Sequence, residues 1–252
     1  MPDKFTIIDK LRETLEPLSY VYAFWLEGAD AAGNADEWSD LDFYIDFQDE
    51  FEDAAYAAVE KALAEVSEID YKYVTQHPHP KLRQRVYHLA GTSKFLMIDF
   101  CFQLHSRPIE DYIYLEGETI EAALVIFDKA DIIRHRPKNP ADYAGRNMFL
   151  LGEAKYHRAQ HLRAEKYVLR GQYLEAYAYY NRYVFEPLVT LLRLIYTPAF
   201  ADYGLVHISQ HIPAAEREKL EYFAQISSFD DISEKMPQAA QWFDELLARV
   251  DL

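Results

Sequence analysis

The sequence predicts an α+β fold in which a mixed β-sheet flanked by helices is followed by an all-α helical bundle. Up to about residue 135, strand-like segments alternate with helical ones, and from about Ala141 the apolar residues recur at helical spacing. The charge changes at the same place, because residues 1–135 carry 27 acidic and 12 basic side chains and residues 136–252 carry 15 and 14. We therefore expect two domains, 1–135 and 136–252, joined at the proline-containing segment 135–140.

The composition excludes several classes of protein. Half of the 252 residues are hydrophobic, which excludes a disordered chain, and the single cysteine, Cys101, excludes an intrachain disulfide framework. The N-terminus lacks the apolar region of a secretory signal, and no apolar run approaches the ~20 residues of a membrane span. A net charge of −16 disfavours nucleic acid as a partner, since binding it requires Lys and Arg to neutralise phosphates. We expect a soluble cytoplasmic protein that binds neither membranes nor nucleic acid.

The first domain begins with a helix and two strands. The N-terminal segment 1–18 predicts an amphipathic helix, because its apolar residues recur every three or four positions. The aromatic and β-branched segment 21–29 predicts a strand that stops at glycine. Segment 41–47 alternates strictly, so Asp42 and its i+2 neighbours lie on the face opposite to Leu41 and Phe43.

A helix and the rest of the sheet follow. Asp49 is placed to cap a helix that runs to about Ala64, with Glu52 as its capping-box partner. Its predicted buried face consists of Phe51, Ala55, Ala58 and Ala62. Further strands are predicted at 68–75, 84–90, 95–104 and 123–127, with a hairpin turn at 91–93.

The second domain is predicted to consist of helices. A basic helix spans 141–170, Gly171 breaks it, and a second spans 172–197, where Pro187 either kinks the helix or begins a new one. Two more helices fit 213–227 and 234–250. One helical face of the second segment carries an apolar stripe: Tyr173, Tyr177, Tyr180, Val184, Leu188, Leu191 and Ile195.

The segment GADAAGNADEWSDLDFYIDF (28–47) is the strongest functional signal. Asp40 and Asp42 are two residues apart and share a face of the strand, where their charges repel unless a cation lies between them. Mg²⁺ suits such a pair, because it prefers a few carboxylates together with phosphate oxygens. Asp99 is an isolated acid in the otherwise apolar FLMIDFCF, and burying an unpaired charge is costly, so it is the expected third ligand. An Asp-x-Asp pair alone is also common in loops and helix caps.

Gly28-Ala29, ten further residues and then Asp40-Leu41-Asp42 resemble the signature of the polymerase-beta-like nucleotidyltransferase superfamily, with Asp99 at the position of its third acid. The triplet Trp38-Ser39-Asp40 and the helical segment RGQYLEAYAYYNRYVFEPLVTLLRLIY resemble small-molecule adenylyltransferases of the aminoglycoside and streptomycin type.

This resemblance implies a chemistry. Mg²⁺ or Mn²⁺ held by Asp40, Asp42 and Asp99 would serve the transfer of a nucleoside monophosphate, with ATP as co-substrate, to a hydroxyl of a small molecule. Asp99 would also accept the proton of that hydroxyl. The nucleotide would be bound by Gly28, Ala29, Ser39, Lys155 and Arg158. Lys155 and Arg158 belong to a basic run, 155–170, for which a solvated helix face is the alternative interpretation.

Ala29 departs from the signature, which has serine or glycine after the first glycine. Its methyl group removes a hydroxyl that would bond phosphate. Two other functions stay open: a protein-adenylylating enzyme, and a nucleotide-binding or interaction module without activity, for which Ala29 is the reason.

Other polar residues have structural interpretations. His77 and His79 fit a surface loop between prolines, and Cys101 fits a packed core thiol. His207 and His211 are expected to be structural or to lie near the substrate. The sequence predicts neither the identity of the acceptor nor the oligomeric state.

Overall fold

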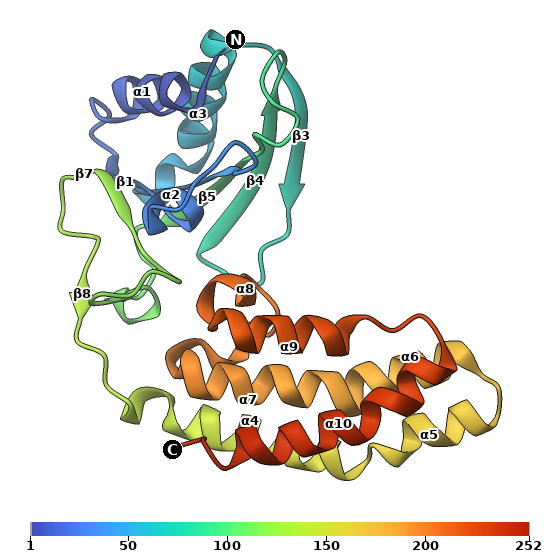
Figure 1. The fold of residues 1–252 in the computed structure, drawn as a ribbon. Helices are drawn as coiled ribbons and strands as arrows, with labels where there is room; N and C mark the ends of the chain where they lie inside the picture. Colours follow the sequence, from blue (N-terminus) through green and yellow to red (C-terminus); the bar gives the residue numbers. More distant parts are fainter. Residues whose placement is uncertain (1, 252) are drawn as a thin grey trace. The chain divides into compact units, whose positions relative to one another are not determined.

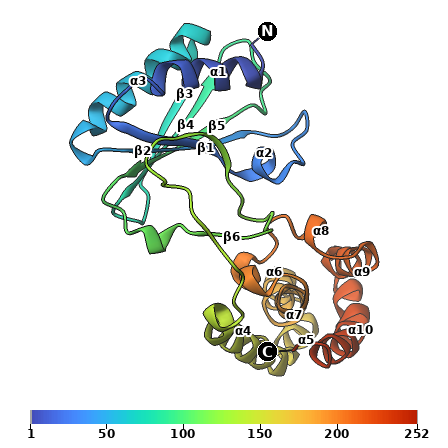
Figure 2. The same cartoon turned by 90° about the vertical axis from the view of Figure 1, so that its left-hand side faces the viewer.

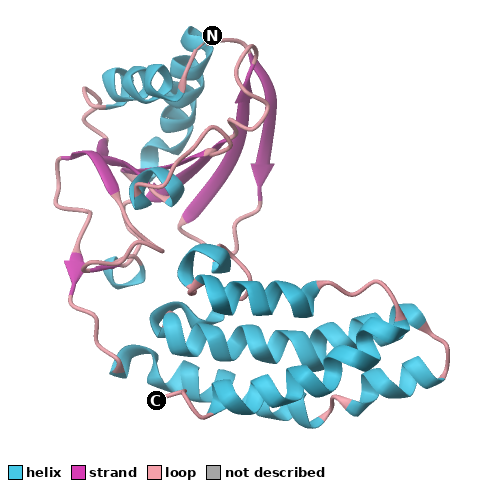
Figure 3. Ribbon diagram, in the orientation of Figure 1, coloured by secondary structure: helices cyan, strands magenta, loops and turns pink. Residues whose placement is uncertain are grey.

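The computed structural model describes residues 2–251 and divides the chain into two compact units, residues 1–138 and 139–252 (Figure 1). The first is a mixed sheet with helices and the second is helical, so the predicted α+β class is confirmed (Figure 3). Within the described residues, every helix is too short or too polar to span a lipid bilayer.

The first unit is built on a six-stranded sheet with the order β3-β4-β5-β2-β1-β7. β2 and β5 are parallel neighbours, and the other pairs are antiparallel. The hairpin turn predicted at 91–93 joins β4 to β5, with Gly91 at φ +77°. The strands are β1 (Val21–Leu26), β2 (Leu41–Phe47), β3 (Ile69–Thr75), β4 (Leu82–Leu89), β5 (Ile98–Leu104) and β7 (Leu124–Asp128).

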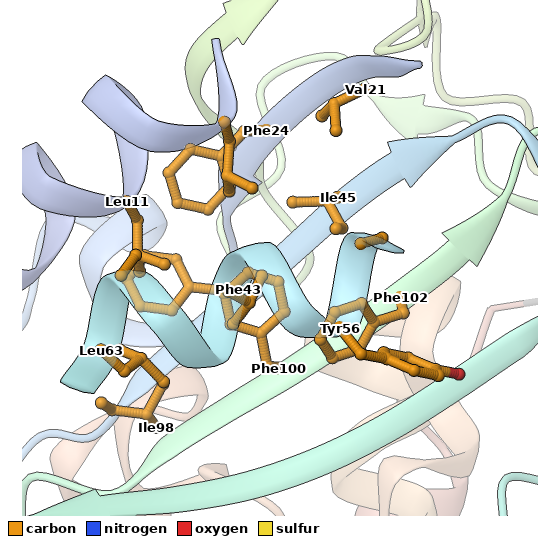
Figure 4. Packing of buried hydrophobic residues seen from close by; sticks show 14 of the residues in the cluster. Leu11, Val21, Phe24, Phe43, Ile45, Tyr56, Leu63, Ile98, Phe100 and Phe102 are labelled. Atoms are coloured by element: carbon orange, nitrogen blue, oxygen red, sulfur yellow. The ribbon is translucent and has the colours of Figure 1, made fainter. Parts of the chain in front are cut away.

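Helices α1 (Lys4–Leu15) and α3 (Glu52–Val66) cover one face of this sheet (Figure 2). Alternate strand residues point at these helices because side chains alternate across a strand. Rings from β1, β2 and β5 pack against one another there, with Phe24, Phe43 and Phe100 fully buried (Figure 4). The opposite face therefore receives the intervening residues, which include Asp42 and Asp99.

The segment after β5 crosses part of that opposite face. It contains the 3-10 turn η2 (Ile109–Asp111) and the short parallel strands β6 (Tyr114–Leu115) and β8 (His135–Arg136). Tyr114 and Ile132 from this segment pack with Ala23 and Trp25 of β1 in a small second cluster. This segment therefore covers part of the sheet face that carries Asp42 and Asp99. Tyr44 of β2 packs at the edge of the small cluster.

The second unit is a helical bundle around α7 (Glu186–Tyr196), whose residues Leu188, Leu191 and Leu192 are fully buried. Arg193 of α7 is also fully buried and donates to the carbonyls of Gly204 and Val206, which holds the irregular segment 197–207. The remaining elements are α4 (Ala141–Ala159), α5 (Leu162–Leu169), α6 (Tyr173–Tyr180), the π-helical turn η3 (Asn181–Phe185), the 3-10 segment η4 (Pro198–Tyr203), α8 (Ile208–His211), α9 (Ala214–Ala224) and α10 (Phe229–Leu247).

Several local predictions in the first unit were wrong. The strand predicted over 21–29 ends at Leu26, and Gly28–Ala32 forms a short helix, α2. Asp49 does not cap α3, because its carboxylate accepts hydrogen bonds from the N–H and hydroxyl of Ser106, and the residue at the cap is Phe51. Phe51 is 39% exposed and therefore lies outside the buried face that was predicted for this helix.

Helix boundaries differ in the second unit. The helix predicted over 141–170 is interrupted at 160–161, while the break predicted at Gly171 is present, with φ +66°. Pro187 lies at the start of α7, directly after the π-helical turn 181–185, and the helical backbone continues from residue 173 to 196 without a break. The last helix begins at Phe229, five residues before the predicted start, because Ser228 caps it through the N–H of Asp231.

Candidate active site: a carboxylate cluster on the sheet

Three predicted site residues come from two neighbouring strands. Asp42 of β2 and Asp99 of β5 are direct partners in the parallel register, and adjacent strands lie about 4.8 Å apart. Asp40 immediately precedes β2 and is exposed, whereas Asp42 and Asp99 are half-buried. The parallel pairing of these two strands therefore brings together acids that are 57 residues apart in the sequence.

The pKa values of Asp42 and Asp99 are both raised. Burial, followed by the charges of Asp40 and Asp99, raises the pKa of Asp42 to about 7. Burial also raises the pKa of Asp99, and Asp40 adds to this effect. A carboxyl group whose ionisation is opposed by other carboxylates is one that a bound cation would stabilise.

Gly28 lies directly against this cluster. Its φ is +60°, and a Cβ atom at this position would lie 2.0 Å from Oδ2 of Asp42. The N–H of Glu27 donates to the carbonyl of Asp42 at 2.9 Å, and Lys4 of α1 bonds Asp30 of α2. The glycine is required here, since no residue with a side chain fits without displacing the Asp42 carboxylate.

The sequence analysis missed Gln84, which holds Asp99. The side-chain N–H groups of Gln84 on β4 donate to both carboxylate oxygens of Asp99, at 2.8 and 2.7 Å. These bonds stabilise the ionised carboxylate and oppose the effect of burial on its pKa. His77, expected in a surface loop, lies near enough to Asp99 for their charges to interact. The sequence does predict that Gln84 lies in a strand. Its contact with Asp99 could not be predicted, because that contact depends on the register between β4 and β5.

Glu27 is the second residue that was missed. It is half-buried, and its Oε1 accepts hydrogen bonds from Nε1 of Trp25 and the hydroxyl of Tyr114. Burial raises the pKa of its carboxyl group. Beside it lies a polar cavity of about 220 Å³, whose lining includes Trp25, Tyr44, Arg107 and Tyr114.

The other predicted residues have local roles. Ala29 lies in α2 and is half-buried, and the hydroxyl of Ser39 is engaged with the Asp36 side chain and N–H in the turn before β2. Lys155 and Arg158 lie on α4 of the second unit, and Arg158 contacts Nδ1 of His161 at 2.8 Å. Their predicted contact with a triphosphate stays a prediction.

Cys101 and His211, for which the sequence favoured structural roles, have environments that fit such roles. Cys101 is buried, and burial raises the pKa of its thiol to about 12, which keeps it protonated and unreactive. His211 lies 2.9 Å from the Arg193 guanidinium through its Nδ1.

The donor chemistry of the cluster suits a hard divalent cation. Among residues 2–251, no group of three or more His, Cys, Asp and Glu side chains is arranged closely enough to hold a metal ion by itself. Mg²⁺, however, typically takes one or two carboxylates and fills its other positions with water and substrate phosphates. Paired Asp42 and Asp99, with Asp40 adjacent, provide that kind of incomplete ligand set.

Comparisons with known proteins find likeness in structure alone. No protein-family model matches the sequence, and no curated protein sequence matches it. The chain is similar to the crystal structure of an aminoglycoside 6-adenyltransferase from Bacillus subtilis, with 11% identity and a TM-score of 0.36 over 99% of this chain and 90% of that chain. It is also similar to a spectinomycin adenyltransferase from Enterococcus faecialis, solved with ATP and spectinomycin, with 10% identity and a TM-score of 0.35 over 98% of this chain and 100% of that chain. Both TM-scores are below 0.5, so this likeness carries no conclusion about function.

Proposed function

We propose that the protein is a metal-dependent nucleotidyltransferase that moves AMP from ATP to a hydroxyl group of a small molecule and releases pyrophosphate. The observation that carries the proposal is the pairing of Asp42 with Asp99 across parallel strands, with Asp40 beside them and Gly28 packed against Asp42. Such a cluster has little value for stability, because burial and the charges of Asp40 and Asp99 oppose the ionisation of Asp42.

Asp40, Asp42 and Asp99 would hold Mg²⁺ or Mn²⁺. The metal would supply neutralisation of the phosphate charge and stabilisation of the attacking and leaving oxygens in an in-line displacement. The affinity for metal is expected to depend on pH, since Asp42 must be ionised to bind it.

The residues of the chain account for the remaining tasks. Asp99, oriented by Gln84, accepts the proton of the acceptor hydroxyl as that oxygen bonds to the α-phosphorus and pyrophosphate leaves. Gly28 leaves room for the triphosphate to approach the backbone, and Ser39 and Ala29 border the same segment. Lys155 and Arg158 are proposed to contact phosphate oxygens.

The charge of the chain favours a cationic acceptor, such as an aminoglycoside. Residues 1–135 carry 27 acidic and 12 basic side chains, which attract a polyamine. The single cysteine, buried and protonated, is compatible with a reducing cytoplasm.

Pyrophosphate release tests the proposal. Purified protein would be given ATP, GTP, CTP or UTP with Mg²⁺ or Mn²⁺ and a panel of aminoglycosides and other polyols. Acceptor-dependent release that disappears in Asp40→Asn, Asp42→Asn and Asp99→Asn, but persists in the exposed control Asp53→Asn, supports it. Release that is unchanged in the three site variants would contradict it.

A second candidate function is a nucleotide-binding module without turnover, and Ala29 is the observation that favours it. A hydrogen bond to a charged group contributes about 1.5–3 kcal/mol, or tenfold or more in affinity. ATP binding that requires Mg²⁺ without pyrophosphate release would support this candidate. Radiolabel transferred from ATP to a protein would instead indicate adenylylation of a protein partner.

A further inference from the structure

The helical unit contains a group of stacked tyrosines and cationic side chains that has no part in the carboxylate cluster. Tyr167 of α5, Tyr179 of α6 and Tyr183 of η3 form a stacked ladder, with ring centroids 4.9 and 5.5 Å apart. The interplanar angles are 8° and 16°, so the three rings are nearly parallel. We call these three residues the tyrosine ladder.

Four cationic side chains lie over the ends of the ladder. Arg163 and Arg182 hold their guanidinium carbons 5.8 and 5.6 Å from the ring centroid of Tyr183. Arg170 and Lys166 lie 5.2 and 5.8 Å from the ring centroid of Tyr167. All four cationic residues are exposed. Each pair makes cation–π contacts with one terminal ring of the ladder.

These cations lack carboxylate partners. Within residues 2–251, none of the four takes part in a salt bridge, although residues 136–252 carry 15 acidic side chains for their 14 basic ones. The Nε of Arg163 donates to Gln160, an uncharged partner. Arg163 and Arg182, which lie over the same ring of Tyr183, therefore keep charges that an anion would neutralise.

A cavity of about 410 Å³ adjoins the ladder. Tyr179, Tyr183 and Arg182 line it together with Leu174, Ala178 and Glu175, which is its one acidic wall residue. The π-helical turn supplies two of these residues, Arg182 and Tyr183, and such turns are frequent at functional sites. Arg182 is thus both a member of the cationic cluster and a wall residue of the cavity.

We propose that this cluster binds a polyphosphate anion, independently of the proposed transferase activity. Three of the four cations are arginines, whose planar forks match phosphate oxygens better than a single charge does. Four positive charges match a chain of several phosphates better than one phosphate. The shared chemistry could belong to inorganic polyphosphate or to the phosphates of a nucleotide.

Calorimetry in EDTA at low salt tests this with the full-length protein. Without metal, the carboxylate cluster repels a triphosphate, so binding reports cationic side chains, and the loss of binding in the Arg163→Gln/Arg182→Gln variant separates this cluster from Lys155 and Arg158. We expect inorganic tripolyphosphate to bind and the affinity to fall with added salt, because exposed charges are screened. ATP binding more tightly than tripolyphosphate would assign the nucleoside part to the cavity, and equal binding would assign the phosphates alone.

The variant is Arg163→Gln/Arg182→Gln, expected to weaken binding at least tenfold. Its matched control is Arg217→Gln/Lys219→Gln on α9, which removes the same charge from paired residues and should change binding less than twofold. Circular dichroism of each variant checks the fold. No binding by the wild type, equal loss in both variants, or stronger binding of an acidic peptide than of tripolyphosphate would overturn the proposal. Failure of the transferase assay would leave this result unaffected.

Discussion

At the scale of single residues, the contact between Gly28 and Asp42 determines the shape of the candidate site. The backbone of Gly28 occupies space that any side chain would contest with the Asp42 carboxylate, and its φ of +60° is one that other residues adopt at a cost. Gly33, at the other end of the same short helix, has φ +75° and open space around it. A comparison of the two glycines therefore distinguishes the steric requirement at Gly28 from the requirement for positive φ that both share.

Gly28→Ala is expected to reduce nucleotidyl transfer at least a hundredfold, because the new methyl group displaces Asp42. The left-handed backbone adds about 1–2 kcal/mol of destabilisation, measurable by urea unfolding. Gly33→Ala has the same backbone cost without the clash, so it should lose similar stability and keep its activity. Equal loss of activity in both variants would assign the role of Gly28 to chain conformation alone.

Gln84→Leu is expected to lower kcat about 10- to 100-fold. Loss of a residue that orients a metal-binding side chain commonly reduces activity by this factor. The substitution removes both hydrogen bonds to Asp99 and leaves the carboxylate free to rotate. Gln241→Leu is the matched control, since Gln241 also donates from its amide to a carboxylate, that of Glu245, at the surface. Steady-state kinetics of the two variants decide, and an unchanged kcat in Gln84→Leu would remove Gln84 from the site.

Strand alternation and an isolated acid in an apolar run are local patterns, so the sequence was sufficient to name Asp40, Asp42 and Asp99 as candidates, and the structure pairs two of them, Asp42 and Asp99. The sequence was insufficient for Gln84 and Glu27. Gln84 contacts Asp99 through the pairing of β4 with β5, and Glu27 acquires its partner Tyr114 from a segment 87 residues away. Contacts of this kind depend on register and on the path of a long loop, which no local pattern contains.

At the scale of elements, Glu60 fastens helix α3 to two strands. Its carboxylate bonds Lys72 of β3 at 2.5 Å, Arg85 of β4 at 2.7 Å and the hydroxyl of Tyr87 at 3.1 Å. Burial disfavours the ionised form, but the hydrogen bonds outweigh it and the pKa of Glu60 is lowered. The helix–sheet packing therefore includes a polar attachment at the edge of the aromatic core.

Glu60→Gln is expected to lower the free energy of unfolding by about 1–2 kcal/mol at pH 7, after allowance for solvent screening. Because the folded pKa lies below the unfolded value, this stabilisation is complete above the unfolded pKa and is lost as pH falls through the folded one. The difference between wild type and variant should therefore shrink below about pH 4.5, the ordinary value of the group. Urea titrations at pH 7 and pH 4 measure it.

Glu65→Gln on the same helix is the control, since Glu65 is more exposed and pairs with Lys10 and Lys61. Its effect at pH 7 should be clearly smaller than that of Glu60→Gln. A Glu60 difference that grew toward low pH would contradict the assigned direction of the pKa shift.

Element types were more predictable than element ends. Alternation and helical spacing identified the six strands of the main sheet and the long helices of both units, because each carries one buried face, but not the short helices α2 and α8. The ends depended on partners that are distant in sequence: Asp49 bonds Ser106 instead of capping α3, and Ser228 begins α10 early. A capping residue is a local signal, but a competing tertiary hydrogen bond decides whether it acts.

At the scale of the whole molecule, the chain has two separate large cores. One contains Phe43 and Leu63 in the first unit, and the other contains Leu191 and Trp242 in the second, with no residue in common. Each unit exceeds 100 residues, a size at which a domain commonly folds alone. Separate cores predict that damage to one unit lowers the stability of that unit only.

The buried tryptophans provide a reporter for each unit: Trp25 is 1% exposed in the first and Trp242 is 2% exposed in the second. In a Trp38→Phe background, Trp242→Phe leaves Trp25 as the only tryptophan, and Trp25→Phe leaves Trp242. Leu191→Ala should lower the urea midpoint seen by Trp242, since deleting a buried leucine costs about 2–5 kcal/mol. It should not change the midpoint seen by Trp25. Leu63→Ala, a substitution of the same kind in the first core, should do the reverse. If each substitution moved both midpoints equally, the two units would unfold cooperatively, which would contradict independent stability of the two cores.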